Sequence, residues 1–282
     1  MPPLHPIAVT GSTGQVGGRV AARLAAAGVA QRLLVRDPAR APQLPGADVR
    51  TIGGYGDVDG VRAALTGIET LLLIPAAEAP DRVAQHVAAI DAAVSAGVSR
   101  IVYLSFLGAR ADATFTLARD HAATEVHVRA TGVAFTFPRM NLYLDFVPSM
   151  VGADGAIRGP AGEGRVSAIL RDDVAASVAA ILTSDGHDGQ TYDLTGPAAF
   201  SLAEAAQTIA RVTGRAIRFE DETLEEAWAS RASYGAPDWE VEGWISSYLA
   251  IASGELDVAS DAVARLTGRA PTSLEQYVAT LT

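Results

Sequence analysis

Glycines at a regular spacing follow a short apolar segment near the start of the chain. The segment Ile7–Thr10 leads into a Gly-x-x-Gly-x-x-Gly turn, and an alanine-rich stretch follows it. Gly11 permits a tight turn after a strand, Gly14 lets the backbone approach a pyrophosphate, and Gly17 lets a helix pack close to the strand. The N-terminus of that helix offers free N–H groups to phosphate. A glycine turn without a ligand is the plainer alternative.

This pattern predicts a dinucleotide site at the turn. The expected contacts are Gly11, Ser12, Thr13, Gly14, Gln15 and Val16.

The end of the second predicted strand, Arg32–Arg36, bears on which dinucleotide binds. In such folds an acidic residue at this point binds the ribose 2′-hydroxyl of NAD, whereas an arginine accommodates the 2′-phosphate of NADP. Arg36 can make paired, charge-assisted bonds to a phosphate. Asp37 leaves two alternatives open, because it could be the ribose acid or could cap the short helix that Pro38 begins. We expect NADP(H) as the cofactor.

Further cofactor contacts are expected where the later strands end. Tyr55 follows the third strand, where the adenine should lie, although an ordinary loop aromatic is an equal alternative. Ile74 and Pro75 follow the fourth strand, beside the ribose. Ser105 and Phe106 end the fifth strand, near the nicotinamide. All of these placements rest on the rule that ligands bind at the carboxyl ends of parallel strands.

The chain contains no lysine, since all 22 basic residues are arginine. A GC-rich coding sequence is the simplest cause, but the chemical consequence holds: no Schiff base, no Walker lysine and no Tyr-x-x-x-Lys pair can form. Reducing an unactivated ketone needs an acid for the developing alkoxide. A quinone gives a delocalised phenolate and a cationic dye needs no acid, so positioning of the reactants supplies most of the catalysis. The sequence therefore favours electron-poor acceptors.

Candidate catalytic residues follow the fifth and sixth strands. Asn141 could hydrogen-bond the carboxamide or the acceptor oxygen, and Tyr143 could stack on a flat acceptor or donate its hydroxyl. His121 lies on the predicted helix between these strands, with a packing histidine as the equal alternative.

Other polar and aromatic side chains are expected to have structural roles. Glu125, one turn after His121, either orients that histidine or is solvated, and the solvated state is slightly favoured. Arg139 is expected to pair with a carboxylate such as Asp145. The tryptophans are expected to pack within the second half of the chain; they are Trp228, Trp239 and Trp244.

The elements that must position these residues alternate between strand and helix in the first half. Alternation of this kind predicts an α/β, Rossmann-like fold, a doubly wound parallel sheet with helices on both faces. The strand candidates are Ile7–Thr10, Arg32–Arg36, Asp48–Ile52, Thr70–Ile74, Arg100–Ser105 and Ala134–Pro138. The helical segments between them are Gln15–Ala27, Val58–Leu65, Asp81–Ala96 and Ala118–Thr131.

After about Asn141 the pattern changes to glycine-rich loops and helices. We predict a nucleotide-binding domain over 1–140 and a smaller, mostly helical substrate lobe over 141–282, with Gln190–Leu194 returning to the sheet. Ser167–Ile169 is a candidate short strand, and Asp172 is a candidate helix cap. Ser201 and Glu204 match a capping box.

The composition limits the cellular compartment and the kinds of partner that we expect. The start of the chain lacks a signal segment and no run is long enough to span a bilayer, so we expect a soluble, cytoplasmic protein without membrane contact. A net charge of −10 argues against a nucleic-acid surface. The chain has no cysteine and no clustered metal ligands, so no metal site is expected. A homodimer stays open as the assembly.

Several segments together resemble the NmrA-like branch of the atypical short-chain dehydrogenase/reductase family. Within that branch the chain is most similar to the NADPH-dependent type 2 quinone oxidoreductases and the triphenylmethane reductases. The matching segments are the glycine turn, Val35–Arg40, Leu71–Ile74, Tyr103–Ser105, Asp120–Glu125, Pro138–Asn141 and Arg171–Ala175.

The resemblance implies a Rossmann-like domain, a small C-terminal lobe and bound NADP(H). It also implies a small-molecule acceptor of the quinone or dye type. The branch includes proteins that bind NADP without turnover and regulate a partner, so a redox sensor is the alternative function. Gly54 departs from the family, which has an acidic residue before the tyrosine, and this leaves the adenine contact at that position open.

Overall fold

The computed structural model describes residues 6–282, so the N-terminal segment in which no signal sequence is predicted lies almost wholly outside the described residues. The dominant element is an eight-stranded sheet with the order β10-β7-β5-β4-β1-β2-β3, in which β6 also pairs with β7. Its strands are β1 Ile7–Thr10, β2 Gln31–Val35, β3 Ala47–Thr51, β4 Thr70–Leu73, β5 Arg100–Tyr103, β6 Ser105–Phe106, β7 Ala134–Met140 and β10 Gln190–Leu194.

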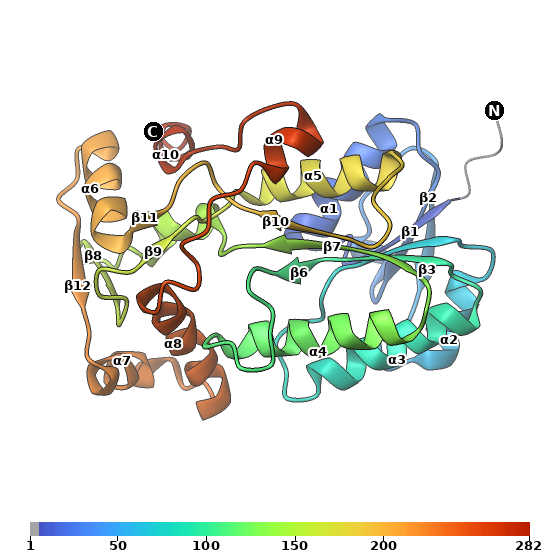
Figure 1. Cartoon of the computed structure of the whole chain (residues 1–282), viewed down its shortest axis with the longest axis horizontal. Helices are drawn as coiled ribbons and strands as arrows, with labels where there is room; N and C mark the ends of the chain where they lie inside the picture. The colour runs from blue at the N-terminus through green and yellow to red at the C-terminus, as the bar shows by residue number, and fades with distance from the viewer. Residues whose placement is uncertain (1–5) are drawn as a thin grey trace. The chain divides into compact units, whose positions relative to one another are not determined.

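The strands from β3 across to β7 pair in parallel, and helices cover the sheet on both faces. Figure 1 shows α1 and α5 on one face and α2, α3 and α4 on the other. These helices are α1 Gln15–Ala26, α2 Val58–Leu65, α3 Arg82–Ser95, α4 Thr116–Ala130 and α5 Arg171–Thr183. The predicted doubly wound α/β fold is therefore confirmed.

The central strands are buried on both faces, which explains their unbroken apolar sequences. Val9 on β1 lies opposite Leu33 on β2 and Leu72 on β4, and all three side chains are fully buried. The strand order reverses at β1, between β2 on one side and β4 on the other. In open α/β sheets this switch point is where the crevice for a ligand forms.

The chain divides into two compact units. Unit 1 runs through Phe106 and adds Asp120–Arg139 and Val174–Tyr192. Unit 2 comprises Leu107–Arg119, Met140–Asp173 and Asp193–Thr282. The predicted division into 1–140 and 141–282 stays a prediction.

Unit 2 combines short strand pairs with helices. A parallel pair joins β8 (Ala156–Gly159) to β12 (Arg218–Asp221), and an antiparallel pair joins β9 (Arg165–Val166) to β11 (Phe200–Ser201). Its helices are α6 Leu202–Thr213, α7 Leu224–Arg231, α8 Asp238–Ala252, α9 Ala262–Thr267 and α10 Leu274–Ala279. The 3₁₀ helices are η2 Leu144–Met150 and η3 Ala232–Tyr234.

Some local predictions for this half are confirmed and others are wrong. Ser201 and Glu204 form the predicted capping box at the start of α6. The strand expected at 167–169 is wrong, since β9 lies earlier and Ile169 makes only an isolated bridge with Tyr143. Asp172 lies in the first turn of α5, because that helix begins one residue before it.

Within residues 6–282, none of the helices has both the length and the apolar character needed to cross a bilayer.

Candidate functional site

The glycine turn links β1 to α1 by close backbone contact. Gly11 has a φ of +63°, a conformation that side chains with a Cβ rarely adopt. A Cβ on Gly17 would lie 2.3 Å from the carbonyl oxygen of Gly11, so the first turn of α1 lies directly against the loop. The N–H of Gly14 donates to the same carbonyl oxygen at 2.9 Å. Larger residues at these positions would force helix and turn apart.

The same turn carries a buried polar atom that lacks a partner. The Oγ of Ser12 makes no hydrogen bond to any part of residues 6–282, although Ser12 is only 2% exposed. It precedes the N-terminus of α1, where Gly14 is the cap and contributes no side-chain bond. Buried hydroxyls normally have a partner. An orphan hydroxyl beside a helix N-terminus fits a phosphate oxygen, so these residues fit the pyrophosphate of a dinucleotide.

The remaining turn residues differ in exposure. Thr13 and Gln15 are exposed, and the Gln15 side chain accepts from Arg19 at 2.6 Å. Val16 is buried on the core face of α1, so only its backbone can meet a ligand.

Arg36 follows the last residue of β2 and is exposed. Asp37 caps the 3₁₀ helix Pro38–Arg40, and its Oδ1 accepts from the N–H of Ala39 at 2.9 Å. The capping alternative for Asp37 is confirmed. Burial raises the pKa of Tyr55 to about 12, and the positive charge of the nearby Arg36 acts against this rise.

The segment after β4 is held by side chains from the neighbouring strand ends. The N–H of Ile74 donates to Oγ1 of Thr10 at 2.9 Å, and the hydroxyl of Tyr55 donates to the carbonyl of Ile74 at 2.5 Å. A Cβ on Gly11 would lie 2.9 Å from that of Ile74, so this segment abuts the glycine turn. Pro75 is half-buried. Tyr55 thus joins the loop after β3 to the segment after β4, and its contact with the adenine stays a prediction.

Two residues further on, α3 binds both backbone polar groups of Ala76. The N–H of Ala76 donates to Nε2 of His86 at 2.9 Å, and Nε of Arg82 donates to the carbonyl of Ala76 at 3.1 Å. His86 and Arg82 are both buried. Neither residue has a role predicted from the sequence, although both lie on the first turns of a helix that follows a predicted cofactor contact.

His121 lies inside this region as well. Its Nδ1 is 2.9 Å from the hydroxyl of Tyr103, and its Nε2 is 3.4 Å from Nη2 of Arg82. Burial and the charge of Arg82 hold the pKa of His121 well below its usual range, so the imidazole is neutral near pH 7. A neutral, enclosed imidazole suits a positioning role better than proton donation, and the catalytic role stays a prediction.

Ser105 and Phe106 are also buried, and their side chains have protein neighbours. The hydroxyl of Ser105 donates to Oε1 of Glu125 at 2.6 Å, and the Phe106 ring lies 6.1 Å from that of His121. Arg139 holds Glu125 with two bonds, of 2.8 and 2.6 Å.

One expectation about these ion pairs is wrong, and the other is confirmed with a different partner. Glu125 is not solvated, since it is 4% exposed on the buried face of α4. Arg139 pairs with a carboxylate, as expected, but the partner is Glu125 and not Asp145, which pairs with Arg171 at 2.9 Å. The reason is that β7 places Arg139 beside α4, a contact that sequence distance does not reveal.

The two other candidate catalytic residues lie in unit 2. Asn141 is fully buried, and its Nδ2 lies 3.1 Å from both Oγ of Ser167 and the carbonyl of Leu256. Its amide group therefore already has protein partners. Tyr143 is half-buried, with the guanidinium of Arg171 4.0 Å from its ring centroid.

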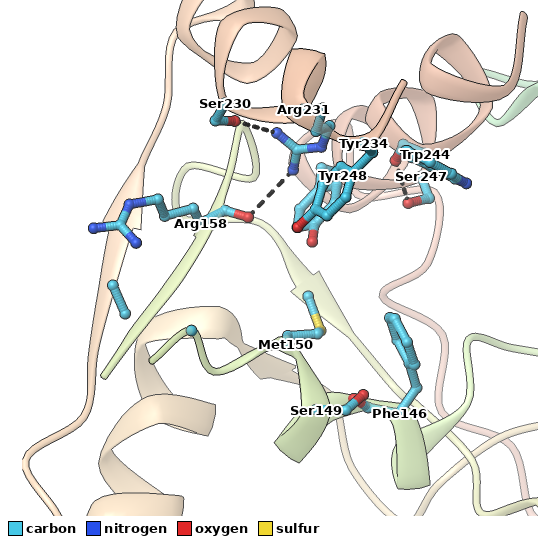
Figure 2. A pocket seen from close by; sticks show the side chains of 12 residues that line it. Phe146, Ser149, Met150, Arg158, Ser230, Arg231, Tyr234, Trp244, Ser247 and Tyr248 are labelled. Carbon is cyan, nitrogen blue, oxygen red and sulfur yellow. Dashed lines mark hydrogen bonds between the residues drawn. The ribbon is translucent and has the colours of Figure 1, made fainter. Parts of the chain in front are cut away.

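Unit 2 also contains a cavity of about 640 Å³ that sequence analysis missed. Figure 2 shows Phe146 and Met150 on one side and Tyr234, Trp244 and Tyr248 on the other. Phe146 and Tyr234 are 56% and 71% exposed, so the cavity wall presents aromatic surface to solvent. The cavity is also lined by Ser149, Gly152, Ala156, Arg158, Ser230, Arg231 and Ser247.

The charge of the cavity wall is largely compensated. Arg231 pairs with the equally buried Glu222 at 2.9 Å and lies 5.1 Å from the ring centroid of Tyr248. Arg158 pairs with Asp154 at 2.6 Å. Trp244 packs against a small apolar cluster, as expected, and lines the cavity as well. The expectation is wrong for Trp228 and Trp239, which are 36% and 38% exposed on the surfaces of α7 and α8. Both arginines among the described residues that line the cavity are thus paired, and the aromatic surface suits a flat apolar molecule.

Comparison with known proteins agrees with this geometry. A family model described as NAD(P)H-binding matches residues 11–185. Quinone oxidoreductase 2 of Escherichia coli is 33% identical, over 98% of both chains. Its crystal structure with NADPH superposes with a TM-score of 0.90, covering 98% of this chain and 99% of the other.

A second similar structure is the triphenylmethane reductase of a Citrobacter species with NADP(H). It is 31% identical, and it superposes with a TM-score of 0.88 over 98% of this chain and 100% of the other. The negative transcriptional regulator NmrA shares the fold, with a TM-score of 0.77 at 16% identity over 98% of this chain and 95% of its own. The resemblance drawn from the sequence motifs is confirmed.

The buried histidine of α3 leads to a pH prediction. Burial and the charge of Arg82 lower the pKa of His86 from its ordinary 6.5 to about 3. The unfolded chain therefore binds a proton that the native state does not, so the free energy of unfolding falls as the pH falls from about 6.5 towards 3. His86→Gln should reduce the loss of stability between pH 6.5 and 5 by ~1–2 kcal/mol, measured by urea unfolding.

Other titratable groups face His86, so the difference between the variant and the wild type is the informative quantity. His121 has a lowered pKa and acts in the same direction, whereas Asp120 has a pKa raised by burial and acts in the opposite one. Equal pH dependence in wild type and variant would show that His86 is not held neutral by the fold.

Proposed function

Because the chain belongs to the NAD(P)H-binding family, we propose that it is an oxidoreductase that uses NADPH to reduce quinones or similar flat, conjugated acceptors. The observation that carries the proposed class of acceptor is the aromatic cavity of unit 2, in which the charge of Arg231 is balanced by Glu222. The similarity of the whole chain to a quinone oxidoreductase and a triphenylmethane reductase supports the same class of acceptor.

The cofactor half rests on the glycine turn and Arg36. The orphan hydroxyl of Ser12 and the N-terminus of α1 would hold the pyrophosphate, with contacts from the backbone of Gly14 and its neighbours. Arg36 would hold the 2′-phosphate, since Asp37 is engaged as a helix cap. Ile74, Pro75 and the strand end at 105–106 would line the ribose and nicotinamide side. When bound, the cofactor supplies a hydride.

The acceptor needs little proton help in this proposal. The chain has no lysine, so it cannot tune a tyrosine acid in the manner of typical short-chain dehydrogenases. Aromatic side chains would stack on the acceptor and orient it, and orientation alone lowers the barrier substantially. Tyr143 stays a candidate for stacking or hydroxyl donation, whereas Asn141 and His121 are proposed to hold their surroundings in place.

A non-catalytic NADP(H) sensor is the second candidate. The fold is shared with NmrA, and a neutral His121 fits a sensor as well as it fits a reductase, because neither needs an acid. A sensor would prefer one redox state of the cofactor and would show no acceptor-dependent oxidation. A cytoplasmic location, the absence of nucleic-acid binding and a homodimer stay predictions.

The direct test is acceptor-dependent oxidation of NADPH. Mixed anaerobically with NADPH and a panel of benzoquinones, naphthoquinones and cationic dyes, the protein should cause loss of nicotinamide absorbance that depends on the acceptor. Binding of NADPH without oxidation by any acceptor in the panel would favour the sensor and overturn the reductase.

The cofactor preference depends on Arg36. Arg36→Glu should weaken NADPH binding by ~1–3 kcal/mol more than NADH binding, because a charge-assisted phosphate contact is lost. Titration of each cofactor by fluorescence measures this difference, with Arg215→Glu as a control for the change in net charge. Equal weakening of both cofactors would remove Arg36 as the discriminating residue.

The cavity predicts an effect on acceptor KM. Tyr234 is exposed at the cavity wall, so Tyr234→Ser should raise the KM for a naphthoquinone by about tenfold while the Kd for NADPH stays unchanged. Trp239 is a surface aromatic of α8 that does not line the cavity, so Trp239→Ser is the matched control. An unchanged KM in the Tyr234 variant would place the acceptor elsewhere.

A further inference from the structure

The backbone of residue 76 has side-chain partners on both of its polar groups. Residues after the end of β4 have no strand to pair with, so their N–H and C=O groups must be bound in another way. His86 accepts from the N–H of Ala76 and Arg82 donates to its carbonyl. Both side chains come from α3, and we refer to this pair as the Ala76 clasp.

The hydrogen-bond directions fix the tautomer of His86. A backbone N–H can only donate, so Nε2 of His86 must be the acceptor and carries no proton. Nδ1 then carries the proton and donates to Oγ1 of Thr124 at 2.8 Å. The Thr124 hydroxyl in turn donates to the carbonyl of Asp120 at 2.8 Å. Only the neutral imidazole satisfies this chain of bonds.

Helix α4 also holds Arg82, the second residue of the clasp, through polar contacts. Arg82 lies 3.4 Å from Oδ2 of Asp120 and 3.4 Å from Nε2 of His121. Nδ1 of His121 reaches the hydroxyl of Tyr103, at the end of β5. The clasp therefore joins the segment after β4 to α3, α4 and β5, entirely within unit 1.

The segment that the clasp holds includes the proposed cofactor contacts Ile74 and Pro75. The backbone of Ile74 is bound by Thr10 and Tyr55, and that of Ala76 by His86 and Arg82. This segment is thus fixed at both ends by side chains that are buried or, for Tyr55, half-buried. Such rigidity matters for binding, since ordering a loop on association costs affinity.

We propose that Arg82 and His86 are positioning residues for the dinucleotide, which hold residues 74–76 in the form that receives it. In this proposal Asp120, His121 and Thr124 of α4 orient Arg82 and His86, and they do not themselves contact the dinucleotide. This inference rests on the proposed function, because it requires that the segment after β4 contacts the cofactor.

The test is the Kd for NADPH, measured by fluorescence titration of the full chain. His86→Leu removes the acceptor for the Ala76 N–H and should raise the Kd about tenfold, as expected when a buried donor loses its partner. His86→Gln retains an acceptor oxygen and should restore most of the affinity. The KM for the quinone should stay within about twofold of wild type, since the acceptor site is elsewhere.

A matched control separates positioning from general stability. His127 also joins α4 to α3, through a bond of 2.7 Å to Asp91, but it is remote in sequence from the strand ends. His127→Gln should leave the Kd for NADPH unchanged. Thr124→Val removes the hydroxyl that orients His86 with little change of volume, and it tests the same point if His86→Leu fails to fold.

The outcomes distinguish this inference from the proposed function. An unchanged Kd for NADPH in folded His86→Leu or Thr124→Val, while wild type binds NADPH and reduces quinones, would overturn the clasp alone. Equal weakening by His127→Gln would also overturn it, because the effect would then reflect the joining of α3 to α4 in general. Wild-type protein that does not bind NADPH would overturn both.

Discussion

The segment after β4 depends on side chains for hydrogen bonds that a sheet would otherwise supply. A parallel strand that ends beside the switch point leaves its next residues without a neighbour, and buried N–H and C=O groups without partners are costly. Here the partners come from β1, from the loop after β3 and from α3. The geometry of the sheet edge is therefore set by residues far apart in the sequence, and the glycine turn packs against the result.

Helix α4 carries different polar residues from the corresponding helix of typical short-chain dehydrogenases, and these residues have a structural role here. In typical short-chain dehydrogenases the corresponding helix carries a tyrosine acid and a lysine, and a chain without lysine cannot reproduce that pair. The same helix here turns His121, Thr124 and Glu125 inward, and each binds another buried polar group. Its polar face serves to fix the ends of β4, β5 and β7, which is consistent with chemistry that relies on orientation.

The sequence predicts the first half of the fold well, because its signals are local. The apolar strands, the spacing of the glycines and the cap at Asp37 each depend on residues a few positions apart. The pairing of Arg139 with Glu125 could not be read in this way, since it depends on β7 lying beside α4. The aromatic cavity was missed for a similar reason: Phe146, Tyr234 and Trp244 come from three separate elements and become neighbours only in the folded unit.

The ion pair between Arg231 and Glu222 sets the physical character of that cavity. Both side chains are 8% exposed, and their charges cancel where a guest molecule would otherwise meet a bare guanidinium. A molecule that binds to such a wall is stabilised by the removal of apolar surface from water, and long-range attraction between charges contributes little. The signature of such binding in calorimetry is a negative change in heat capacity with little dependence on ionic strength, so uncharged aromatic guests gain most from this surface and sulfonated ones gain least.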